Sequence, residues 1–212
     1  LQAAQRNASQ ANSVLQIADG AVNTIATILD RMKELATAAA SDNSGTTART
    51  NLDAEYPELV LEIDRLAATT VYQGTALLDG AYTGTFLVSS SGDYAANDTI
   101  TVDGTTLDMA SATVLGAAAA NLTSLANAQA ELLKIDVGIT AVGTAIGVIG
   151  AGQSRIEYAS TNVASTYQNT IAAESVIRDA DMAFEMTVFT KFQILQQAGT
   201  AMLAQANQAP QS

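Results

Sequence analysis

Apolar side chains recur in alternating steps of three and four residues along the first forty positions of the chain. The members of this row are Leu1, Ala4, Ala8, Ala11, Leu15, Ala18, Val22, Ile25, Leu29, Met32, Ala36 and Ala39. Such spacing is typical of a heptad seam on one face of a helix. A second row lies beside it and consists of Val14, Ala21, Ile28 and Leu35. The predicted helix therefore has an apolar face broad enough for more than one neighbour.

The same rhythm returns in the second half of the chain, from about Leu122 to about Ala180. Its members are Leu125, Ala128, Leu132, Ile135, Ile139, Val142, Ile146 and Ile149, followed at seven-residue spacing by Ile156, Val163, Thr170 and Ile177. Five glycines fall within this stretch, at positions 138, 143, 147, 150 and 152. Glycine weakens an isolated helix but lets a neighbour approach closely. We expect this helix to pack side by side with the first one.

Between the two seams the pattern changes twice. The turn-forming cluster Ser41–Gly45 ends the first helix. An apolar face over roughly Thr47–Thr70 predicts a second helix, and Pro57 is expected to kink it or to delay its start. Two β-prone runs around the polar connection Ser89–Asp93 then predict a β-hairpin at about 84–103.

The last thirty residues carry a further helical face. Its members are Phe184, Val188, Phe192, Leu195, Gly199, Met202 and Ala206. The printed sequence holds nothing after residue 212 that would cover this face, so we expect another molecule to cover it. The patterns together predict a mainly α fold, an elongated rod of long packed helices with heptad-like, coiled-coil seams and a small β-hairpin region. Its parts are a helical core over 1–182 and a C-terminal assembly helix over 183–212.

Composition narrows the function. Aromatic residues make up only 5% of the 212 residues while 48% are hydrophobic, which suits closely packed helices of small and aliphatic side chains. The nine basic residues are scattered and the net charge is −12, so we expect no nucleic acid partner. There is no Cys and no His, which excludes zinc sites with those ligands, histidine bases and thiol nucleophiles. No cleavable signal and no run of eighteen uninterrupted apolar residues is present.

Candidate chemistry is sparse. The acidic cluster is Asp53, Glu55, Glu58, Glu62 and Asp64, with Arg65 beside it, and we expect it to be a solvated face. The glycines at 147–152 lie in a helical seam with no strand before them, so they do not predict dinucleotide binding. Asp93, Asn97, Asp98 and Asp103 lack the spacing of a calcium loop, and Asp179 and Asp181 are expected to be ordinary helix-end residues. The sequence predicts no catalytic residue, no metal site and no cofactor.

Several motifs in order resemble bacterial flagellins along nearly the whole chain. Gln193–Gln211 closely resembles the C-terminal flagellin signature, and Ser175–Ala183 is similar to the family's SRIEDADYA segment. Near the other end, Asp30–Ala36 looks like QRVRELA and Glu62–Arg65 matches EIDR. Arg6-Asn7-Ala8 is similar to part of QRNANDG, and in Val71–Leu78, which stands where flagellins have QFNGVKVL, Gln73 replaces the family's Asn.

The resemblance implies a structural protein that is not an enzyme. Flagellins are exported by the flagellar secretion apparatus, with an export chaperone and without a cleaved signal, and self-assemble with other flagellin subunits into the filament that supports motility. The expected location is therefore secreted, at the bacterial flagellum and cell surface. Relative to the family pattern the chain looks like a truncated, minimal flagellin: it starts inside the first helix, lacks large outer domains and stops a few residues early.

Other partners follow from the same resemblance. Arg31, Leu35 and Glu55 stand at positions where some flagellins contact a Toll-like innate receptor. A flagellin-like surface protein that captures a polysaccharide is the alternative function. A junction protein between hook and filament is a further candidate, but the Gln-Ala-Asn-Gln ending at 205–208 speaks against it. The zinc-protease activity of some flagellins is excluded because the chain has no His.

Overall fold

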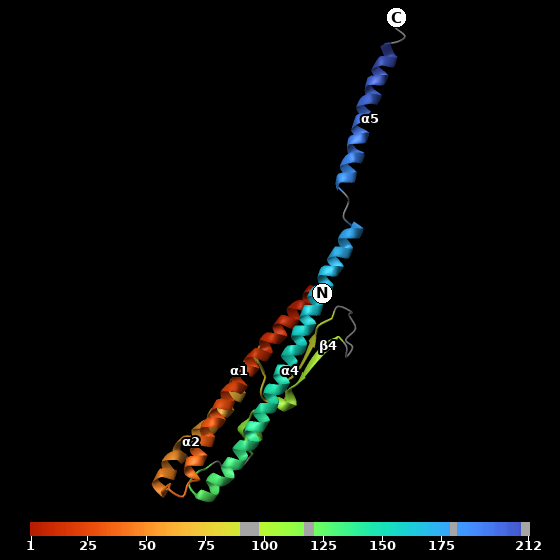
Figure 1. The fold of residues 1–212 in the computed structure, drawn as a ribbon. Coiled ribbons are helices and arrows are strands. Elements are labelled where there is room, and N and C mark those ends of the chain that lie inside the picture. Colours follow the sequence, from red (N-terminus) through yellow and green to blue (C-terminus); the bar gives the residue numbers. More distant parts are fainter. Residues whose placement is uncertain (90–97, 117–120, 179–181, 209–212) are drawn as a thin grey trace. The chain divides into compact units, whose positions relative to one another are not determined.

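The computed structural model describes residues 1–89, 98–116, 121–178 and 182–208 (Figure 1). The chain divides into two compact units, Leu1–Tyr167 and Gln168–Ser212. The first unit holds the helical core and the described strands, and the second holds the end of one long helix and the last helix. The predicted mainly α fold with a small β region is confirmed.

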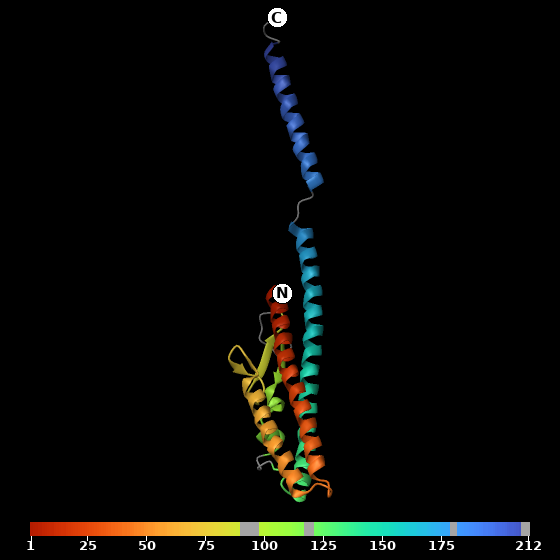
Figure 2. The same ribbon diagram turned by 90° about the vertical axis from the view of Figure 1, so that its left-hand side faces the viewer.

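Two long helices form the frame of the first unit. They are α1 (Gln2–Ala39) and α4 (Leu125–Arg178). Every member of the predicted first row from Ala4 to Ala39 is buried. Figures 1 and 2 show α1 and the first part of α4 side by side. Gln2 bonds Tyr167 and Lys33 bonds Asp136, so the two helices run antiparallel.

The second helix, α2 (Thr46–Thr69), turns back along α1. Pro57 lies well inside it, so the prediction of a late helix start is wrong. The buried side chains of Tyr56 and Ile63 hold the helix on the core on both sides of the proline. The guanidinium of Arg49 donates to the carbonyls of Ala39 and Ser41 at 2.8 and 2.9 Å, so it satisfies acceptors at the end of α1.

Two antiparallel strand pairs complete the unit. The strands β3 (Thr83–Leu87) and β4 (Thr99–Asp103) pair with Thr83 opposite Asp103 and Leu87 opposite Thr99. The predicted hairpin is therefore confirmed, while most of its predicted polar connection, positions 90–97, lies outside the described residues. A second hairpin of β1 (Val71–Tyr72) and β2 (Thr75–Ala76) was not predicted.

The turn of this short hairpin shows why the sequence did not reveal it. Gln73 and Gly74 both have positive φ, +49° and +83°, as a two-residue hairpin of the I′ type requires. Asn-Gly is the usual signal for that turn, and Gln is a poorer residue for a left-handed backbone.

Short helices and acidic side chains hold the connections. The 3₁₀ helix η1 (Gly104–Leu107) and the helix α3 (Ser111–Val114) follow β4. Asp64 of α2 accepts hydrogen bonds from the backbone N–H and the hydroxyl of Ser111, at 2.8 and 2.9 Å. Asp53, earlier on the same helix, accepts from the backbone N–H of Leu122. Part of the predicted solvated acidic face therefore binds the segments that cross α2.

One charged side chain lies in the core. Glu131 of α4 is 3% exposed and accepts a hydrogen bond of 3.0 Å from the hydroxyl of Tyr56. Its other oxygen accepts from Lys134, 2.7 Å away on the next turn. Burial, and then the nearby Glu131 carboxylate, raise the pKa of Tyr56, which stays a neutral donor. Each oxygen of the buried carboxylate therefore has a partner.

The glycines of α4 do not share one role. A Cβ at Gly138 would lie 2.9 Å from Cγ1 and 3.0 Å from the carbonyl oxygen of Val114. A Cβ at Gly152 would lie 3.1 Å from Leu15 and 3.0 Å from Val102. At positions 143, 147 and 150 it would meet nothing within 4 Å. The expected close approach is thus correct for two glycines and wrong for the other three within the described structure of a single chain.

The last helix, α5 (Met182–Gln208), belongs to the second unit. The stretch Leu125–Ala206, which crosses the undescribed positions 179–181, includes a window that is long and apolar enough to span a membrane by length and composition alone. Helices packed into a protein core pass the same test, and α4 has one side packed in the core.

The glycine contacts predict opposite effects of one substitution on one helix. Gly143→Ala should stabilise the protein by about 0.5–1 kcal/mol, because it removes the entropic cost of helical glycine and meets no neighbour. Gly138→Ala should destabilise it by about 1–3 kcal/mol, because backbone at Val114 must move. Urea unfolding of both variants measures the two signs; equal stabilisation would show that α3 does not press on Gly138.

The buried carboxylate gives a second prediction. Glu131→Ala should cost about 3 kcal/mol, because it leaves the Tyr56 hydroxyl buried without its acceptor and Lys134 without its partner. Tyr56→Phe should cost only about 1 kcal/mol, because Glu131 keeps Lys134. In a double-mutant cycle measured by denaturant unfolding, the two losses should add to more than the loss in the double variant. Strict additivity would contradict the contact.

Candidate assembly and recognition surfaces

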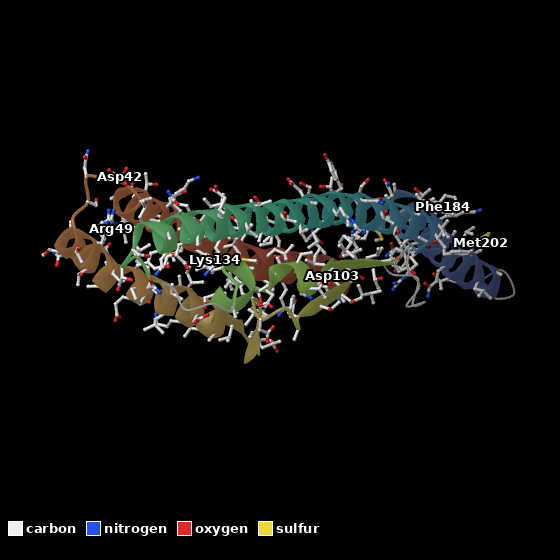
Figure 3. All side chains as sticks on the ribbon, turned by 90° about the horizontal axis from the view of Figure 1, so that it is seen from below. Asp42, Arg49, Asp103, Lys134, Phe184 and Met202 are labelled. Carbon is white, nitrogen blue, oxygen red and sulfur yellow. The ribbon has the colours of Figure 1, made fainter. Side chains whose placement is uncertain are left out.

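The predicted assembly face lies on α5. Phe184, Phe192, Leu195 and Met202 are between 55% and 68% exposed, and Val188 is partly buried. At about 100° per residue these five positions fall within an arc of about 80° on the helix surface. Figure 3 shows the side chains of Phe184 and Met202 standing off the α5 ribbon. The structure therefore gathers the predicted residues on one side of the helix and leaves four of them open.

The apolar surface of α5 is wider than the predicted face. Met186, Phe189, Ile194 and Leu203 are 55–64% exposed as well, and they lie outside that arc. The spacing used for the prediction follows one row and does not reveal these neighbours. Only Glu185 and Lys191 are charged along the whole helix. A 27-residue helix with this surface is uncommon on a protein that remains a monomer.

The candidate receptor residues lie near the start of α2 and the end of α1. Arg31 donates two hydrogen bonds to the carboxylate of Glu55, at 2.8 and 3.1 Å, and a third of 3.0 Å to Glu34. The Arg31 and Glu55 side chains are 49% and 44% exposed. Leu35 by contrast is 3% exposed. The structure thus brings Arg31 and Glu55 together at the surface and places Leu35 in the core.

The ion pair shifts the pKa of both Arg31 and Glu55. The hydrogen bond from Arg31, followed by its positive charge, holds the pKa of Glu55 below its ordinary value, while desolvation acts the other way. The hydrogen bonds from Arg31 to Glu55 and then Glu34 raise the pKa of Arg31. Because the pair is exposed, its contribution to stability is that of a surface ion pair.

The acidic cluster of α2 does not converge on a site. Glu55 binds Arg31, and Glu62 binds Arg65 one turn along the same helix. Asp53 and Asp64 bind backbone N–H groups of other segments. Among the described residues no group of three or more acidic side chains is arranged to hold a metal ion.

Among the remaining candidates, Asp103 has an ordinary role at the start of a short helix. Asp103 accepts from the backbone N–H and hydroxyl of Thr105, which lowers the pKa of Asp103 and caps η1. Asp93, Asn97, Asp179 and Asp181 lie outside the described residues.

Comparison with known proteins points to one family. Residues 1–83 match the family model of the bacterial flagellin N-terminal helical region, and residues 132–212 match that of the C-terminal helical region. The flagellin of Halalkalibacterium halodurans is 38% identical over 212 residues, which cover all of this chain and 76% of that protein. The Listeria monocytogenes flagellin is 36% identical over 221 residues, covering this whole chain and 77% of its own length.

Further relatives agree in sequence and in structure. The flagellar filament 33 kDa core protein of Treponema phagedenis is 32% identical over 229 residues, covering all of this chain and 78% of that protein. The crystal structure of Bacillus cereus flagellin aligns with a TM-score of 0.65 at 30% identity, over 80% of this chain and 94% of that one.

The Arg31–Glu55 pair predicts a pH dependence. Because the pKa of Glu55 is lower in the folded than in the unfolded chain, the pair stabilises the fold fully above the unfolded pKa of about 4.3, and this contribution disappears as pH falls through the folded pKa. Glu55→Gln should therefore lower the melting temperature slightly at pH 7 and leave it unchanged well below pH 4. Thermal melts across this range measure the difference.

A matched control separates this effect from loss of negative charge. Glu58 lies one turn along the same helix and has no hydrogen bond or ion pair among the described residues. Glu58→Gln should show no such pH-dependent loss. A wild-type advantage over Glu55→Gln that grows towards pH 2 would contradict the role of the pair.

Proposed function

The chain belongs to the bacterial flagellin family, and from this premise we propose how its subunits join. It is a structural subunit of the flagellar filament, which lies outside the cell and serves motility. The proposal is that subunits associate through the apolar surface of α5, with Phe184, Val188, Phe192, Leu195 and Met202 at the centre of the contact.

One observation carries this proposal: α5 exposes its large apolar side chains. No member of the predicted assembly face has the near-zero exposure found along the α1 seam. Covering one such side chain is worth roughly 1.5–3 kcal/mol relative to leaving it in water. A subunit of a homopolymer has identical copies at hand to provide the cover, so association between helices of this type is the favourable outcome.

The same surface supports two further partners. A helix that exposes this much apolar surface associates non-specifically unless it is covered before assembly, which favours an export chaperone that binds the C-terminal region. Family membership supports delivery through the flagellar secretion apparatus, and hence secretion.

Recognition of outside molecules stays a prediction from resemblance. The exposed Arg31–Glu55 pair is accessible to a Toll-like innate receptor, whereas Leu35 is buried in the core. No comparison favours capture of a polysaccharide.

Paired substitutions test the proposal. Replacing Phe184 and Phe192 by Gln should prevent filament growth from sheared filament seeds by the full-length protein, because it removes two large apolar groups from the centre of the face. The melting temperature should stay unchanged, because neither side chain contributes to the core of the first unit. Electron microscopy and sedimentation measure growth.

The control removes an apolar side chain from the other side of the same helix. Met186 is 55% exposed and points away from the predicted face, so Met186→Gln should leave growth close to wild type. Normal filaments from the Phe184 and Phe192 double variant would overturn the proposed contact.

A further inference from the structure

The helix α4 is buried on one side only within the first unit. Its buried positions there are Ala128, Glu131, Ile135, Gly138, Val142, Ala145, Ile149, Gly152, Ile156 and Val163. On the opposite side lies what we term the outward row of α4: Leu133, Val137, Thr140, Thr144, Gly147, Ala151 and Tyr158, all exposed. Leu133, Val137 and Tyr158 are among the most exposed large apolar side chains of the chain, at 71%, 65% and 79%.

Between Val137 and Ala151 the outward row also lacks charge, whereas the exposed Arg155 lies on the same side of the helix before Tyr158. Between Asp136 and Arg155 the helix has no charged side chain, although the net charge of the chain is −12. A helix with one face in a core usually carries charged and polar groups on the other, and a helix that is apolar all round is normally covered all round. The composition of α4 therefore fits a helix with a second cover that a single chain does not provide.

A second uncharged surface lies on α1. Ser13, Gln16, Ile17, Gly20, Asn23, Thr24 and Thr27 are exposed and form the outward row of α1. The surface of this row projects less at Gly20, which has no side chain; a Cβ there would meet nothing within 4 Å. The exposed side of α2 differs, since it carries Glu55, Glu58, Glu62 and Arg65.

We propose that, in the filament, the outward row of α4 in one copy packs against the outward row of α1 in a neighbouring copy. This inference rests on the proposed function, because it requires a polymer of this chain. A contact that joins two different surfaces repeats without closing and so suits an open helical filament, whereas one self-complementary surface ends at a dimer.

Electrostatics favours the same pairing. Two chains of charge −12 repel each other, so close contact is least costly where neither surface carries charge. From Val137 to Ala151 on α4 and from Ser13 to Thr27 on α1, the outward rows are uncharged exposed stretches of the long helices of the described first unit.

The size of the contact explains why it does not hold a dimer. The shorter row, from Ser13 to Thr27 on α1, is about 21 Å long at 1.5 Å per residue and about 10 Å wide, so the contact covers roughly 210 Å² per partner. The total of roughly 400 Å² lies below the 1,200–2,000 Å² of a stable interface. The contact therefore forms in the polymer, where other contacts act with it, and free chains stay monomeric.

Cross-linking tests the pairing, and the absence of native Cys makes it clean. A full-length chain that carries both Thr24→Cys and Thr144→Cys is assembled into filaments and treated with a short bis-maleimide. A ladder of dimers, trimers and longer species on a denaturing gel is expected. Chains with either substitution alone should stay monomeric, as should the combination of Thr144→Cys with Asn51→Cys on the charged side of α2.

The outcomes separate this inference from the proposed function. Filaments that form but give no ladder overturn the pairing of the two rows and leave assembly through α5 intact. Dimers from Thr144→Cys alone show a self-complementary contact and also overturn it. If the wild-type chain forms no filaments, the proposed function fails, and the pairing of the two rows, which requires the polymer, fails with it.

Discussion

The antiparallel packing of α1 against α4 is the interaction on which the rest of the structure depends. Its buried row on α1 is largely alanine towards the N-terminus and becomes Val, Ile, Leu and Met further along. Small side chains let two backbones approach, and each contact contributes little, so stability comes from length. Near Gly152 the approach is close enough for Leu15 of α1 and Val102 of β4 to lie against the same residue. The helices therefore place the hairpin as well as each other.

Polar groups then determine how the shorter elements attach to this frame. Arg49 of α2 donates to carbonyl groups at the end of α1, while Asp53 and Asp64 bind backbone groups of the segments that pass over α2. These contacts involve backbone groups at the ends of elements, where helices leave donors and acceptors without internal partners. With few aromatic residues to fill gaps, the fold uses directional hydrogen bonds to locate its connections.

Periodicity alone predicted the long helices, the larger hairpin and the row on α5, because each depends on spacing within one segment. What it missed depends on contacts between segments. Glu131 looks like any charged helix residue until Tyr56 meets it, and the five glycines of α4 differ only in what lies opposite them. The β1–β2 hairpin was not predicted, because Gln73 adopts a left-handed backbone conformation that its residue type disfavours. The wider apolar surface of α5 was not predicted, because the spacing defines only one row of helix positions.

The buried Glu131 has a consequence for the polymer. A seam built from repeated heptads has nearly equivalent alignments one repeat apart, and sliding by one repeat would shift a helix by about 10 Å. Tyr56 finds its acceptor in only one of those alignments, because the residues one repeat before and after Glu131 are Ser124 and Gly138, and neither is a carboxylate. The polar contact thus fixes the register of α4 on the core in each subunit. Equal spacing of the subunits along a fibre of many copies requires such a fixed register, since a shifted helix in one subunit would become a defect in the lattice.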